Sequence, residues 1–126
     1  MKKAGTVLIY NCTGPKFSKM RQIFAMLRLL MRPVTPDKYE LPLKDLVAGT
    51  GESSAQPGDA FEENMLVFCG LSPALLNQVL EVLRLAELPP IHLKAVLTET
   101  NQDWDSRQLY EELKEERAAI EAAKAE

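Results

Sequence analysis

Two short segments of the chain combine residue types that can bind an anion. The first is Asn11–Lys16 (Asn-Cys-Thr-Gly-Pro-Lys) and the second is Cys69–Ser72 (Cys-Gly-Leu-Ser). Glycine lets the backbone approach a ligand closely, hydroxyl and amide groups donate hydrogen bonds, and lysine adds positive charge. Each segment also precedes a predicted helix, whose free N-terminal N–H groups attract an anion. We therefore expect these segments to bind a small anionic ligand, such as a phosphate or a carboxylate.

The candidate ligand-binding residues come from both segments, from the start of the first helix and from the end of the last strand. They are Asn11, Cys12, Thr13, Gly14, Lys16, Ser18, Cys69, Gly70, Ser72 and Thr98. Gly14, Lys16 and Ser18 do not have the spacing of a P-loop, so the pattern does not predict a nucleotide triphosphate site. The alternative interpretation is structural, because hydroxyls also cap helices and glycines also form turns.

The two cysteines suggest a second kind of chemistry. Cys12 and Cys69 each follow a predicted strand and precede a predicted helix, and a helix N-terminus lowers the pKa of a thiol. A thiol-dependent enzyme or redox switch is therefore an alternative function. Two cysteines and one histidine make a poor metal set, and there is no C-x-x-C motif or Ser–His–Asp arrangement. We assign no catalytic residue, metal or cofactor, and favour a protein that is not an enzyme.

Four strands and four helices are expected to position these residues. Continuous apolar runs predict two buried central strands, whereas a proline and a half-polar pattern predict two edge strands. The helices follow from apolar residues at helical spacing and from capping residues. The expected strands are 6–10, 32–35, 65–69 and 92–97, and the expected helices are 19–31, 36–48, 73–87 and 106–118, the last capped by Asp105 or Ser106.

This order predicts a single α/β domain over residues 1–126, with a flexible loop at 49–60 and a frayed tail at 119–126. The expected architecture has three layers, αβα, around a four-stranded, mostly parallel sheet of order 2-1-3-4. We expect the first and last helices on one face, the second and third on the other, and no internal repeat. The two central strands would then run parallel, and the ligand crevice would lie at their carboxyl ends.

Charge and composition narrow the function classes. The chain has a net charge of −3, yet residues 1–38 carry eight Lys or Arg and one acid. We interpret the basic first helix as a solvated face complemented by the acidic last helix. The acidic total, without interleaved aromatic and basic residues, argues against nucleic acid. No apolar run approaches the roughly 20 residues that span a membrane, and no signal peptide is predicted, so we expect a cytoplasmic protein.

Three segments resemble a small bacterial family catalogued as a domain of unknown function, number three-seven-eight-three. They are Leu8–Asn11, Met65–Gly70 and Pro90–Thr98. The resemblance implies a bacterial, cytoplasmic protein, and it implies no activity, cofactor or catalytic residue.

The sequence thus favours a non-enzymatic module that binds a small anionic ligand or a protein partner, without nucleic acid or membrane. A further alternative is a homo-oligomerising module. Its interface would use the first helix, where Met26 and Leu29 widen the apolar stripe. The expected state is therefore a monomer or a homodimer.

Overall fold

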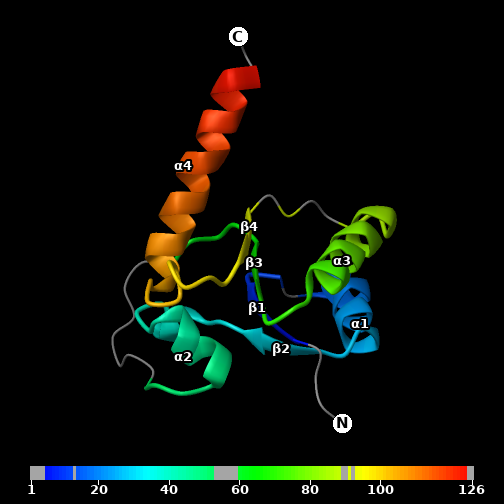
Figure 1. Ribbon diagram of the computed structural model, residues 1–126, viewed down its shortest axis with the longest axis horizontal. Helices are drawn as coiled ribbons and strands as arrows, with labels where there is room; N and C mark the ends of the chain where they lie inside the picture. The colour runs from blue at the N-terminus through cyan, green and yellow to red at the C-terminus, as the bar shows by residue number, and fades with distance from the viewer. Residues whose placement is uncertain (1–4, 13, 53–59, 89–90, 92, 125–126) are drawn as a thin grey trace.

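A computed structural model describes residues 5–12, 14–52, 60–88, 91 and 93–124. Figure 1 shows one sheet with helices on both faces. The elements are β1 (Gly5–Tyr10), a 3₁₀ turn (Pro15–Phe17), α1 (Ser18–Met26), β2 (Leu29–Pro33), a 3₁₀ turn (Pro36–Lys38), α2 (Leu43–Ala48), β3 (Met65–Cys69), α3 (Pro73–Leu85), β4 (Leu93–Val96) and α4 (Ser106–Lys124).

The sheet confirms the predicted α/β class and the strand order β2-β1-β3-β4. The pairs β1–β2 and β3–β4 are parallel, so the sheet is mostly parallel. The central pair is antiparallel, with Thr6 opposite Cys69 and Tyr10 opposite Met65. The prediction that the two central strands run parallel is therefore wrong. The carboxyl end of β1 lies beside the amino end of β3, so the two carboxyl ends are at opposite ends of the sheet's strands.

Two asparagines fix this antiparallel arrangement where β1 ends and β3 begins. The Asn11 side-chain amide donates hydrogen bonds to the carbonyl oxygens of Phe61, at 2.8 Å, and Glu63, at 3.0 Å. The Asn64 side chain donates in return to the Asn11 carbonyl at 2.7 Å. These bonds hold the residues before β3 beside the carboxyl end of β1, so β3 starts there and runs back along β1.

The reversal also decides which helices share a face. The unit β1–α1–β2 steps one way across the sheet, and β3–α3–β4 steps the other way with its strands reversed. Right-handed connections in both units therefore place α1 and α3 on the same face, side by side (Figure 1). The short helix α2 and the long helix α4 cover the opposite face. The expected pairing of the first helix with the last is wrong, because it assumed four parallel strands.

The molecule therefore consists of two β–α–β–α halves related by an approximate two-fold axis between β1 and β3. Left-handed backbone occurs at equivalent points in both halves. Asn11 (φ 63°) and Gly70 (φ 76°) follow the first strand of each half, and Arg28 (φ 64°) and Glu87 (φ 55°) follow the first helix. This structural repeat was not expected from the sequence, because few side chains are shared between the halves.

The first helix is shorter than its apolar pattern predicts. Leu27, Leu30 and Met31 continue the helical stripe, yet α1 ends at Met26 and β2 begins at Leu29. Leu29 and Met31 instead pair with Gly5 and Val7 of β1. Sheet pairing overrides helical periodicity here, since β1 needs a parallel neighbour on this side.

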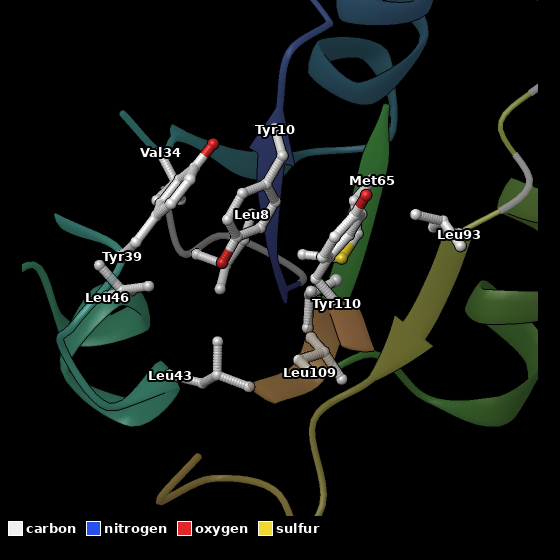
Figure 2. Close-up of a cluster of buried hydrophobic side chains, with 11 residues drawn as sticks. Leu8, Tyr10, Val34, Tyr39, Leu43, Leu46, Met65, Leu93, Leu109 and Tyr110 are labelled. Carbon is white, nitrogen blue, oxygen red and sulfur yellow. The ribbon is translucent and has the colours of Figure 1, made fainter. Parts of the chain in front are cut away.

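All three tyrosines of the chain meet in the core between the sheet and the α2–α4 layer (Figure 2). Phe61 stacks on Tyr110, with ring centroids 4.0 Å apart, and on Tyr39, at 4.7 Å. The Tyr10 hydroxyl shares a buried 2.7 Å hydrogen bond with the Ser106 hydroxyl at the start of α4. This bond joins the middle of the sheet to the last helix.

Tyr39 differs from Tyr10 in the fate of its hydroxyl. Figure 2 shows the two hydroxyls pointing to opposite ends of the cluster. The buried Tyr39 hydroxyl has no hydrogen-bond partner among the described residues. Asn11 lies near enough to oppose the rise that burial causes in the pKa of Tyr39, but makes no hydrogen bond with it.

The Tyr10–Ser106 bond yields a stability prediction. Tyr10→Phe or Ser106→Ala leaves one buried hydroxyl unsatisfied, so each should lower the free energy of unfolding by about 1–3 kcal/mol. In urea denaturation, the double variant should lose less than the sum of the two single variants. Tyr39→Phe is the matched control and should cost little, because it removes a hydroxyl without a described partner. Additive losses at Tyr10 and Ser106 would contradict the assigned bond.

A second prediction concerns alkaline pH. Burial raises the pKa of Tyr10, Tyr39 and Tyr110 above the ordinary tyrosine value. Above roughly pH 10 the unfolded chain loses these protons while the folded chain retains them, so stability should fall as pH rises. Urea midpoints should be lower at pH 10.5 than at pH 8.5, and Tyr10→Phe should reduce that difference. An unchanged midpoint would argue against buried, neutral tyrosines.

Candidate functional site

The predicted ligand residues do not form one crevice. The segment after β1 lies at one end of the strands, whereas Cys69, Gly70, Ser72 and Thr98 lie at the opposite end. Thr6 and Tyr10, which mark these two ends on β1, are separated by about 13 Å of strand. The expected crevice between the carboxyl ends of β1 and β3 is therefore wrong, because those ends point in opposite directions.

The predicted residues that follow β3 and β4 include two, Ser72 and Thr98, whose hydroxyls have structural partners. The Ser72 hydroxyl caps α3 by accepting a 3.1 Å hydrogen bond from the Leu75 N–H, as its sequence position predicted. The Thr98 N–H donates to the Asn101 side-chain oxygen at 2.8 Å, and the Thr98 hydroxyl accepts from the Asn101 N–H. For Ser72 and Thr98, capping and turn formation therefore account for the hydroxyls.

A pocket of about 490 Å³ lies at the carboxyl ends of the parallel strands β1 and β2. In open α/β sheets ligands commonly bind at the carboxyl ends of parallel strands. The described lining residues come from the end of β1 and the segment after it, from α1, and from the end of β2 and the turn that follows it. They are Ile9, Asn11, Cys12, Gly14, Arg21, Pro33, Val34, Thr35 and Pro36. We call this cavity the β1–β2 pocket.

Arg21 of α1 is the one positive charge in this lining. Its Nη1 donates to the Cys12 carbonyl at 3.3 Å, and its Nη2 donates to the Gly14 carbonyl at 3.3 Å and to the Ser18 hydroxyl at 3.4 Å. These neutral partners orient the guanidinium without cancelling its charge. Among the described residues, no carboxylate forms an ion pair with Arg21.

Three of the predicted residues line the β1–β2 pocket, namely Asn11, Cys12 and Gly14. Asn11 has a structural task as well, since its amide holds the residues before β3. Ser18 contributes through Arg21, and Lys16 lies outside the lining, with its Nζ 5.5 Å from the Phe17 ring centroid. Thr13 lies outside the described residues.

Arg21 and the residues after β2 were missed by the sequence analysis. The basic first helix contained a signal for Arg21, because Ser18 and Arg21 are three residues apart and so share a helix face. Thr35 had no such signal. Its place in the pocket depends on the parallel pairing of β1 with β2, which the sequence placed three residues later than it occurs.

The thiols do not have the properties of a reactive pair. Cys12 lies beyond Tyr10, at the carboxyl end of β1, whereas Cys69 pairs with Thr6 near the opposite end of that strand. Burial raises the pKa of the Cys12 thiol to about 11 and also raises the pKa of the half-buried Cys69 thiol. Desolvation therefore outweighs any lowering by the nearby helix N-termini, which is the opposite of what nucleophilic chemistry requires.

A second hollow, of about 550 Å³, lies beside α4, and both of its described cations, Arg107 and Lys114, are already paired with carboxylates. The Tyr110 hydroxyl donates a hydrogen bond to the Glu63 carboxylate, which lowers the pKa of that carboxyl group. Lys114 Nζ lies 3.8 Å from the same carboxylate and 5.0 Å from the Tyr110 ring centroid. Since these groups satisfy one another, this hollow is a weaker candidate for a charged ligand than the β1–β2 pocket.

The described part of the chain also bears on metal binding and on membrane insertion. There, no group of three or more His, Cys, Asp or Glu residues is arranged to hold a metal ion. None of its helices combines the length and apolar character needed to cross a membrane.

Comparison with known proteins places the second half of the chain beside one family. Residues 64–120 match the family described as Domain of unknown function (DUF3783). The chain resembles that family. The match spans β3, α3, β4 and most of α4, which is one of the two structural halves, and it leaves Leu8–Asn11 outside. No curated protein and no solved structure matches the chain.

The buried thiols give a kinetic prediction. At neutral pH a pKa of about 11 leaves Cys12 with roughly 100-fold fewer thiolates than an ordinary cysteine. Under graded iodoacetamide treatment, mass spectrometry should show Cys69 modified first and Cys12 only slowly, with the Cys12 rate rising up to about pH 11. Rapid modification of Cys12 in the folded protein at pH 7 would restore the thiol-dependent alternative.

Proposed function

We propose that the protein is a non-catalytic binding module that holds a small anionic ligand in the β1–β2 pocket. The observation that carries this proposal is the orientation of Arg21, a charged guanidinium fixed by carbonyl oxygens at the edge of that pocket. The ligand class is a phosphate or a carboxylate, as the residues of the first segment indicate.

The pocket suits recognition of a small charged group. Arg21 supplies charge and further N–H donors to the lining. The Asn11 amide already donates to the carbonyls of Phe61 and Glu63, and the Thr35 hydroxyl donates to the Asp37 carboxylate, so recognition of an anion rests on Arg21. Ile9, Pro33, Val34 and Pro36 form apolar walls, in which an ionic hydrogen bond is less weakened by water. An anion with a short apolar portion fits this combination better than a bare ion.

The lining also favours binding over catalysis. Its titratable side chains are Arg21 and Cys12, and burial keeps the Cys12 thiol protonated near neutral pH. Neither group is suited to move a proton at that pH. A bacterial, cytoplasmic setting remains part of the proposal, supported by two cysteines that are both free.

The test is a titration of the isotopically labelled full chain with inorganic phosphate and, separately, with acetate. Amide signals of Asn11, Cys12, Gly14 and Thr35 should shift together with a single dissociation constant. Arg21→Gln should weaken binding by about 10–100-fold, since a hydrogen bond to a charged group contributes about 1.5–3 kcal/mol.

Arg28→Gln is the matched control, because Arg28 follows the same helix but does not line the pocket. It should leave the dissociation constants unchanged. Equal effects of the two substitutions would indicate general charge attraction and refute the pocket. Unchanged amide signals with both anions at 50-fold molar excess would refute the anion-binding function.

A further inference from the structure

The strand β4 leaves an open edge on the sheet. Among the described residues, β4 pairs with β3 on one side and with no strand on the other. Natural edge strands are usually protected by proline, by several charges or by a covering element. The residues Leu93–Val96 contain no proline and one charge, that of Lys94. The Val96 carbonyl accepts a 3.1 Å hydrogen bond from the Asn101 side chain and has a second lone pair, so the backbone of β4 can still pair with another strand.

The helix α4 is longer than its own half of the sheet requires. Leu109 and Tyr110 are buried against the core, whereas residues 118–123 are all exposed. Figure 1 shows the C-terminal half of α4 projecting past the β4 edge, away from the other elements. Ile120 lies on this projecting part and is 49% exposed. The overhang therefore carries an apolar side chain beyond the edge of the sheet.

Incompletely filled space lies on both faces of the sheet at this edge. On the α4 face, a hollow of about 430 Å³ is lined by Leu93 and Ala118 together with polar and charged residues, Glu63, Asn64, Lys114, Arg117 and Glu121. On the α3 face, a hollow of about 320 Å³ is lined mainly by leucine and isoleucine, including Leu80 and Ile91. The exposed side chains of Leu80 and Val96, at 36% and 44%, lie beside it.

We propose that a second copy of this chain occupies the β4 edge and forms a two-fold symmetric dimer with an eight-stranded sheet. The two β4 strands would pair antiparallel about an axis perpendicular to the sheet, which keeps each face continuous across the dimer. Side chains that oppose each other must then share a face. This condition permits a two-fold axis at Lys94, Ala95 or Val96. We place it at Ala95, because that register pairs all of residues 93–97 and keeps the two Lys94 side chains apart; Ala95 then opposes Ala95 of the partner subunit, and Lys94 opposes Val96 of the partner subunit.

The α4 overhang explains why the partner is a second copy. In this arrangement each overhang passes its own β4 and covers the partner's β4 on the α4 face. Ala95 and Leu97 point to that face and are only partly buried in the single chain. The partner's overhang would cover them, and Ile120 would be buried. An unrelated strand would pair with the β4 edge but would leave the α4 overhang, and Ile120 on it, uncovered.

The test measures self-association of the full chain by sedimentation equilibrium, with charge changes at the predicted Lys94–Val96 contact. Val96→Lys places two lysines opposite each other on both sides of the axis and should raise the dimer dissociation constant at least about tenfold. Val96→Glu creates two Lys–Glu pairs and should preserve or strengthen the dimer. Val96 is exposed, so circular dichroism should show both variants folded.

Ile120→Asp should also weaken the dimer, whereas Met26→Asp is the matched control. Met26 is exposed on α1, away from the β4 edge, and its replacement should leave the dissociation constant unchanged. A wild-type chain that stays monomeric at 500 µM would overturn the proposal. So would a dimer that Val96→Lys and Val96→Glu affect equally, because the predicted register makes their effects opposite.

Discussion

The antiparallel pairing of β1 with β3 is the constraint on which the rest of the structure depends. It is fixed at one end by two asparagine side chains, which tie the residues before β3 to the end of β1. Both strands are apolar on both faces, so burial alone would permit either direction of pairing. The hydrogen bonds of Asn11 and Asn64 favour the observed direction, because they hold the start of β3 at the carboxyl end of β1.

Several features of the molecule follow from that direction. The two β–α–β units become related by a two-fold axis, so α1 and α3 share one face and α2 and α4 share the other. Each half contains its own pair of parallel strands. The carboxyl ends of the two pairs point in opposite directions. The β1–β2 pocket lies at the carboxyl ends of the strands of the first half, and Asn11 of its lining is bonded to the residues before β3. The match of residues 64–120 to one family coincides with this division.

The polar chemistry of the two layers is different. Between the sheet and the α2–α4 layer, Tyr10 shares a hydrogen bond with Ser106 and Tyr110 donates one to Glu63, whereas the Tyr39 hydroxyl has no described partner. At the end of β1, Arg21 keeps its charge while carbonyl oxygens orient it. This oriented guanidinium, without an ion-pair partner among the described residues, is the feature that supports the proposed anion site.

The sequence by itself determined the α/β class, the strand order, the bounds of β3 and the cap of α3 at Ser72, and it offered Asp105 or Ser106 as the cap of α4. These follow from local patterns: continuous apolar runs, a Ser-Pro helix start, and a carboxylate that accepts from the Gln108 N–H. Tertiary structure alone decided the direction of β3, the early end of α1 and the grouping of site residues. Strand direction depends on side-chain bonds between residues about fifty positions apart, which no local pattern records. Leu29–Met31 fit a helix or a strand equally well, and pairing with β1 made them a strand.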